Sequence, residues 1–132
     1  MFKRPVFNEI ISRLNEKRRF IQVLMGPRQT GKTTLAQQIL KETSMQNHYA
    51  TADEPMQKDR SWIEQQWEIA RLKIKSQKDR VLLILDEIHK IPYWNETVKR
   101  LWDEDTMSKR QVYVILLGSS SLLMSKGPGE SL

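Results

Sequence analysis

The hydrophobic positions of this chain follow two patterns, helical spacing and short continuous runs, which alternate along the sequence. Apolar residues three or four positions apart, such as Val6, Ile10 and Leu14, predict amphipathic helices. By this criterion the predicted helices cover residues 5–18, 33–42, 62–78 and 92–105. The intervening apolar runs predict strands at residues 20–25, 48–51, 81–85 and 111–117. This alternation predicts an α/β fold, a mainly parallel sheet of about four strands flanked by helices in three layers.

Length and composition fit a single domain over residues 1–132. A chain of 132 residues can bury a core, and 39% hydrophobic and 29% charged residues are ordinary proportions for a globular protein. The apolar runs are too short to cross a bilayer and no signal-peptide pattern follows Met1, so we expect a cytoplasmic protein without a membrane partner. The absence of cysteine excludes disulfides and thiolate metal sites.

The net charge of +6 leaves two interpretations open. The basic groups at residues 17–19, 73–78, 99–100 and 109–110 would suit a surface for nucleic acid. Acidic residues are interleaved with them, however, and no alternation of aromatic and basic residues indicates a base-stacking platform. This second observation favours solvated helix faces over a nucleic-acid site.

Residues 26–33 match the phosphate-loop pattern G-x-x-x-x-G-K-[ST], between a predicted strand and a predicted helix. The candidate nucleotide-binding residues are Gly26, Pro27, Arg28, Gln29, Thr30, Gly31, Lys32, Thr33 and Thr34. The glycines let backbone N–H groups approach a phosphate, and the following helix presents its positive end to the same anion. We expect Lys32 to reach the β and γ phosphates, the Thr33 hydroxyl to bind Mg²⁺ and Thr34 to face the α-phosphate.

An acidic pair follows the third predicted strand. The five apolar residues 81–85 place Asp86 at the carboxyl end of a buried strand, which is where parallel sheets bind ligands. Asp86 is therefore the second candidate Mg²⁺ ligand, and Glu87 is the candidate base that polarises the attacking water. The alternative is that the two acids only begin the next helix. Ser119, at the end of the fourth strand, would orient water or sense the γ-phosphate, unless its serine-rich segment is only a turn.

The chain resembles an ASCE-class P-loop ATPase of the AAA+ superfamily. More narrowly, it resembles the prokaryotic AAA+ group of ATP-binding proteins that carry an uncharacterised C-terminal domain. The resemblance rests on the phosphate loop and on three further motifs, residues 53–55, 85–94 and 117–123. It implies ATP and Mg²⁺ as ligands, with Lys32, Thr33, Asp86, Glu87 and Ser119 in the roles given above. In this family the chain continues into an arginine-bearing segment, a fifth strand and a helical lid, so we expect a truncated ATPase core with an exposed edge on its phosphate-loop strand that is open to self-association.

Two functions from different classes fit these motifs. The first is an Mg²⁺-dependent ATPase module that binds ATP and ADP and couples hydrolysis to a conformational change. The second is a nucleotide-gated binding module with little turnover, for which nucleic acid is the candidate partner. Among the remaining residues, we expect His89 to be a solvated helix-start histidine, Asp53 and Glu54 to turn the chain, and the tryptophans to pack in the core or an interface.

Overall fold

The computed structural model describes residues 5–26, 32–53 and 59–119. Helices and strands alternate along these ranges, as the apolar pattern predicts. The elements are α1 (Pro5–Leu14), β1 (Gln22–Gly26), α2 (Lys32–Glu42), β2 (Gln46–Thr51), α3 (Arg60–Arg71), β3 (Arg80–Asp86), the 3-10 helix η1 (Ile88–Lys90), α4 (Trp94–Ser108) and β4 (Gln111–Ser119). None of the helices in these ranges is both long and apolar enough to cross a membrane.

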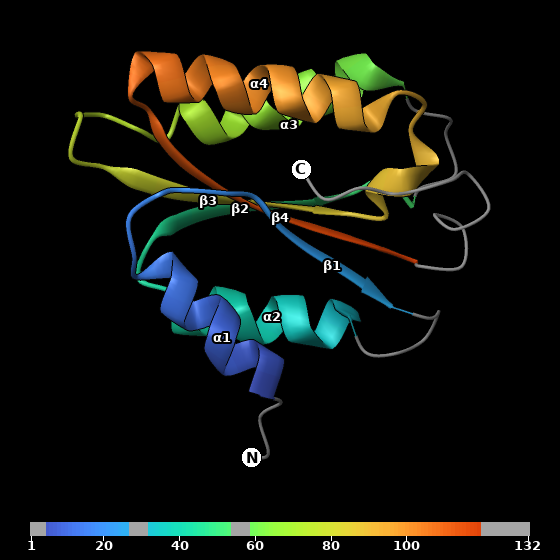
Figure 1. Ribbon diagram of the computed structural model, residues 1–132, viewed down its shortest axis with the longest axis horizontal. Helices are drawn as coiled ribbons and strands as arrows, with labels where there is room; N and C mark the ends of the chain where they lie inside the picture. The colour runs from blue at the N-terminus through green and yellow to red at the C-terminus, as the bar shows by residue number, and fades with distance from the viewer. Residues whose placement is uncertain (1–4, 27–31, 54–58, 120–132) are drawn as a thin grey trace.

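The four strands form one sheet in the order β1-β4-β3-β2, and every pairing between them is parallel. Helices α1 and α2 cover one face and α3 and α4 cover the other (Figure 1). This three-layer α/β arrangement confirms the fold class expected from the sequence. Because all strands run in the same direction, their carboxyl ends meet at one edge and the connections from each helix to the next strand meet at the opposite edge.

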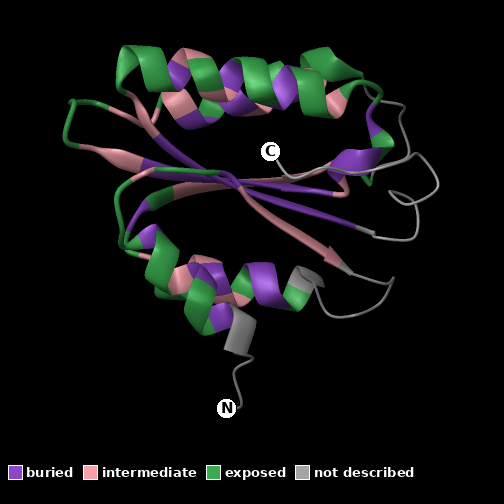
Figure 2. Ribbon diagram, in the orientation of Figure 1, coloured by how far each residue is buried: buried purple, intermediate pink, exposed green. Residues whose placement is uncertain are grey.

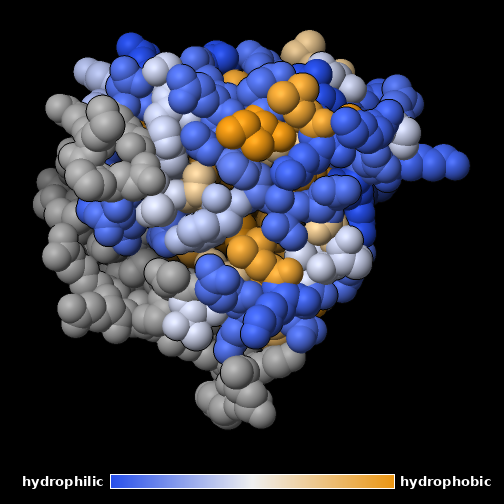
Figure 3. Space-filling view, turned by 180° about the vertical axis from the view of Figure 1, so that it is seen from behind, coloured by the Kyte–Doolittle hydropathy of each residue, from blue (hydrophilic) through white to orange (hydrophobic). Residues whose placement is uncertain are grey.

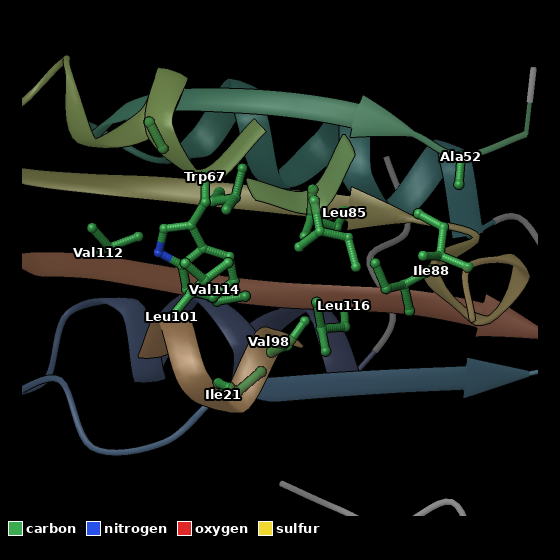
Figure 4. Packing of buried hydrophobic residues seen from close by; sticks show 14 of the residues in the cluster. Ile21, Ala52, Trp67, Leu85, Ile88, Val98, Leu101, Val112, Val114 and Leu116 are labelled. Carbon is green, nitrogen blue, oxygen red and sulfur yellow. The ribbon is translucent and has the colours of Figure 1, made fainter. Parts of the chain in front are cut away.

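Alternate residues of the central strands enter two separate cores, since successive side chains of a strand point to opposite faces. Strand β3 sends Val81, Leu83 and Leu85 toward α3 and α4, and Leu82 and Ile84 toward α1 and α2. The strands in the middle of the sheet are accordingly the most deeply buried part of the chain (Figure 2). Figure 4 shows the first core, in which Trp67 lies between the sheet and the two helices.

The third helix is shorter than its apolar pattern predicts, and it ends at Arg71. Two apolar residues of the predicted stretch 62–78, Ile69 and Leu72, are exposed. The carboxylate of Asp79 accepts hydrogen bonds from the backbone N–H groups of Lys75 (2.8 Å) and Ser76 (3.1 Å). Side-chain acceptors of this kind compete with helical hydrogen bonds. The chain therefore turns into β3 where sequence spacing alone predicted helix.

A buried carboxylate joins α3 to α4. Asp105 is fully buried and accepts hydrogen bonds from Trp67 Nε1 (2.7 Å), Arg71 Nε (2.8 Å) and Arg110 Nε (2.7 Å). Trp67 is buried, and the other three tryptophans, Trp62, Trp94 and Trp102, are partly buried against the same core. The expectation that the tryptophans serve packing is confirmed.

Candidate nucleotide site at the carboxyl edge of the sheet

Three of the strands bring the predicted site residues to the carboxyl edge of the sheet. Strand β1 ends at Gly26, the first phosphate-loop residue, and β4 ends beside it with Ser119 paired to Gly26. Strand β3 lies on the other side of β4 and ends at Asp86. Neighbouring strands are ~4.8 Å apart, so the ends of β1 and β3 are separated by about two such spacings. The predicted phosphate loop is thus preceded by a strand that ends at Gly26 and followed by a helix, α2, that begins at Lys32.

Part of the predicted site lies outside the described residues. This holds for residues 27–31 and Glu54, and for the side chains of Lys32, Thr33 and Ser119. Thr34 is exposed in the first turn of α2. The roles predicted for these residues therefore remain predictions.

Asp86 has a buried side chain with one oxygen bonded and one oxygen unbonded. The Tyr49 hydroxyl on β2 donates a 2.7 Å hydrogen bond to Asp86 Oδ2. Asp86 is only 3% exposed, and its Oδ1 has no hydrogen-bond partner within the described ranges. A buried polar atom is rarely left in this state unless an ion, water or ligand meets it. The donor set fits a hard cation that is also held by substrate phosphates, which is the usual setting of Mg²⁺.

Tyr49 was not identified from the sequence. Burial raises the pKa of the Tyr49 hydroxyl, and its hydrogen bond to the Asp86 carboxylate raises it further. Tyr49 consequently keeps its proton at neutral pH and acts as a donor that fixes the orientation of Asp86. The parallel register pairs Tyr49 with Ile84, two residues before Asp86. A hydroxyl on the strand beside the acidic strand was the only signal in the sequence.

Glu87 adopts a left-handed backbone conformation, with φ 57° and ψ 36°, directly after the strand. This conformation costs a residue with a side chain roughly 1–2 kcal/mol and is concentrated at functional sites. Glu87 is the N-cap of the short 3-10 helix η1 and its carbonyl accepts a hydrogen bond from the Lys90 N–H (3.1 Å), so the acidic pair does lead into a helix, but the Glu87 side chain makes no capping hydrogen bond. The Glu87 side chain is 21% exposed, so its carboxylate remains accessible to water.

The expectation for His89 was wrong. Its side chain is only 3% exposed, and its Nε2 lies 3.4 Å from Glu87 Oε1. Gly118 explains this burial, because a Cβ atom at position 118 would lie 2.9 Å from His89 Nδ1 and 2.9 Å from Met25 Sδ. The imidazole thus occupies space that only a glycine leaves open. A histidine beside an acidic pair looks solvated in the sequence, since the contact with Gly118 is made across 29 residues of chain.

Asp53 follows the end of β2 and lies at the same edge. Its backbone N–H donates to Thr51 Oγ1 (3.1 Å), and its carboxylate forms an exposed ion pair with Lys90 of η1 (2.5 Å). The predicted turn after β2 is therefore supported at Asp53. The ion pair links the end of β2 to the segment that carries Glu87. No group of three or more acidic residues, histidines or cysteines in the described ranges could hold a metal ion by itself.

Comparisons with known proteins agree with this geometry. Among solved structures, the chain is similar to Cdc6p from Pyrobaculum aerophilum (TM-score 0.62, 17% identity, 97% of this chain and 43% of that chain). It is also similar to the T158V variant of RuvB from Thermotoga maritima (TM-score 0.57, 20% identity, 88% of this chain and 36% of that chain). At these identities the similarity establishes the fold, and the chain spans less than half the length of either protein.

No match was found among curated proteins. A protein-family model described as an AAA domain matches residues 18–132, which include the phosphate loop, the acidic pair and Ser119. The match covers most of the chain. The chain therefore belongs to the AAA domain family.

Proposed function

We propose that this domain binds ATP with Mg²⁺ at the carboxyl edge of its sheet and hydrolyses the nucleotide to ADP and phosphate. One observation carries the proposal. The buried Asp86 carboxylate, oriented by Tyr49 through Oδ2, leaves Oδ1 without a partner at the edge where the phosphate loop begins. Family membership supports ATP as the nucleotide.

Each candidate residue has a defined task in this proposal. The backbone of residues 26–33 and the Lys32 ammonium bind the phosphates. Asp86 and the Thr33 hydroxyl would hold Mg²⁺, which supplies charge neutralisation at the β and γ phosphates when it is bound. Glu87 orients a water molecule and accepts its proton as the water oxygen attacks the γ-phosphorus and the bond to the bridging oxygen breaks. Ser119 is the candidate contact to the γ-phosphate.

The left-handed turn at Glu87 supports its task. The turn directs the chain away from the line of β3, so two adjacent acids serve different positions. Asp86 remains buried within the sheet, and Glu87 is partly exposed. A buried oriented carboxylate suits a metal ligand, whereas a carboxylate open to water suits a base.

A second function is a nucleotide-gated binding module with little turnover. The observation that favours it is the 3.4 Å approach of His89 Nε2 to Glu87 Oε1, since a carboxylate that interacts with a neighbouring imidazole is less available to a water molecule. In this case ATP occupancy, rather than hydrolysis, would be the signal.

Hydrolysis and binding by the full-length protein separate the two functions. The variant Glu87→Gln should bind ATP with Mg²⁺ as tightly as the parent in calorimetry but lose hydrolysis by ~10²-fold or more. Lys32→Ala should lose binding itself. Glu96→Gln is the matched control, because Glu96 is exposed in the first turn of α4 and the chemical change is the same. Equal hydrolysis rates for the parent and Glu87→Gln would reject the hydrolase and leave the gated module.

A further inference from the structure

The excess positive charge of the chain is concentrated at the edge of the sheet opposite the nucleotide site. The connections α1–β1, α2–β2, α3–β3 and α4–β4 all reach this amino edge, because the strands are parallel. Together they contain eight basic and two acidic residues, an excess of six that equals the net charge of the whole chain. The remainder of the chain is therefore neutral overall.

Ion pairing distinguishes the lysines of these connections from several basic residues on the helix faces, whereas Arg19 and Arg110 of the connections pair with Glu16 (3.4 Å) and Asp105 (2.7 Å). On the helix faces, Arg13, Lys99 and Arg100 each pair with an acidic residue of their own or a neighbouring helix. In the connections, the lysines make no ion pair within the described part of the chain; they are Lys17, Lys73, Lys75, Lys78 and Lys109. Neighbouring acidic residues thus neutralise these basic residues on the helices, but they do not neutralise the lysines at the amino edge.

The α3–β3 connection gives the clearest case. Asp79 lies among Lys73, Lys75 and Lys78, but its carboxylate is occupied by the backbone N–H groups of residues 75 and 76. The three lysines and the start of β2 line a hollow of about 320 Å³. In Figure 3 this edge lies at the right margin, where the surface is mostly hydrophilic, and apolar side chains gather nearer the centre of the face shown. Asp79 and Arg80 also line the hollow, so an anion entering it would meet four basic side chains against one carboxylate.

The arrangement of the connections suits an extended anion. The basic residues lie in the three connections that lead into β1, β4 and β3, because residues 43–45 before β2 carry no charge; these strands are neighbours in the sheet, so two strand spacings make a row ~10 Å long. This length corresponds to several phosphates of a nucleic-acid strand, which are ~3.4 Å apart along the helix axis of each strand of a duplex. At the β1 end of the row, the exposed Phe20 ring lies 5.6 Å from the Arg13 guanidinium carbon and 5.8 Å from that of Arg19. An aromatic ring among arginines is a surface on which an unpaired base stacks.

We propose that the amino edge binds the phosphate backbone of a nucleic acid, with single strands preferred because of Phe20. This assignment is independent of the proposed nucleotide site, which lies at the other end of the strands. A flat anionic lipid surface is the competing partner. A lipid surface would be bound by the basic residues alone and would not stack on Phe20.

Fluorescence anisotropy of a labelled 20-nucleotide single strand, titrated with the parent protein at several salt concentrations, tests the proposal. The double variant Lys75→Gln/Lys78→Gln should bind about tenfold more weakly, and its log–log salt slope should fall by ~1.5. The control Lys99→Gln/Arg100→Gln removes the same charge from α4 and should bind as the parent does. Lys32→Ala should also retain parental affinity, so that failure of the nucleotide site and failure of this surface are distinguished.

Two further measurements identify the partner. Phe20→Ala should weaken binding of the single strand but leave binding of a 20-base-pair duplex unchanged. Vesicles containing phosphatidylserine should bind weakly in comparison. The proposal is overturned if the parent binds no oligonucleotide, if both double variants lose affinity equally, or if vesicles bind and oligonucleotides do not.

Discussion

Replacing Asp105 by alanine tests whether the buried carboxylate holds α3 and α4 together. The substitution removes the acceptor of three hydrogen bonds, from Trp67 Nε1, Arg71 Nε and Arg110 Nε. Arg71 has a side chain that is only 14% exposed, so its positive charge would remain largely buried without its shortest ion pair. Removal of one partner of a buried ion pair typically costs about 3–5 kcal/mol.

A loss of this size is a large part of the free energy of unfolding of a small domain, which is typically ~5–15 kcal/mol. Urea denaturation followed by tryptophan fluorescence measures it directly, because Trp67 itself contacts Asp105. Should the alanine variant fail to fold, Asp105→Asn is the milder form. It keeps an oxygen acceptor but removes the charge, and we expect a loss of about 1–3 kcal/mol.

Asp103→Ala is the matched control for this experiment. It makes the same change two residues earlier on the same helix, but Asp103 is exposed, and its ion pair among the described residues is the i,i+4 pair with Lys99 at 3.2 Å. Exposed pairs of this kind contribute about 0.5 kcal/mol. If the variants at 105 and 103 differ in unfolding free energy by less than ~1 kcal/mol, the role assigned to Asp105 is refuted.

Three further predictions concern the nucleotide site. Tyr49→Phe removes the hydrogen bond to Asp86, and we expect Mg²⁺-dependent ATP affinity to fall by about tenfold in calorimetry, as the loss of a hydrogen bond to a charged group predicts; unchanged affinity would show that Asp86 is oriented without the phenol. The pKa of the Tyr49 hydroxyl is raised in the folded state, so the contribution of this group to stability is complete below the unfolded pKa of ~10 and is lost as pH rises above that value. The difference in unfolding free energy between the parent and Tyr49→Phe should therefore shrink in urea titrations at alkaline pH. A difference that stays constant with pH would contradict the raised pKa. Gly118→Val places side-chain atoms where His89 and Met25 already lie, and we expect a melting temperature lower by several degrees together with lost hydrolysis; parental values for both would contradict the packing described here.

The sequence predicts the order and type of the α-helices and strands within the described residues, because these elements follow from the local spacing of apolar residues; the 3-10 helix η1 was not predicted. The run at residues 81–85 predicts both the central strand and the position of Asp86 at its end. Boundaries were less predictable. The side-chain hydrogen bonds of Asp79 end the helical course early, and such competition between side chain and backbone has no periodic signal.

The residues of the candidate site also fall into a predictable group and an unpredictable group. Motif residues with fixed spacing, Gly26 and Asp86, were located correctly relative to the sheet. The residues that surround them, Tyr49 and His89, act through contacts between segments distant in the chain. His89 is buried in space that is open because Gly118 has no side chain, and the pattern of hydrophobic residues does not predict such a space.

The close packing around Gly118 has a consequence for the history of the family. Met25 adjoins the first residue of the phosphate loop, and His89 lies beside Glu87, so one glycine separates the two segments that would flank a nucleotide. A larger residue there would meet two neighbours from different elements, Met25 of β1 and His89 of η1, and both would have to shift. We therefore expect family members that hydrolyse nucleotide to retain glycine at position 118. Members that have lost hydrolysis should show other residues at this position.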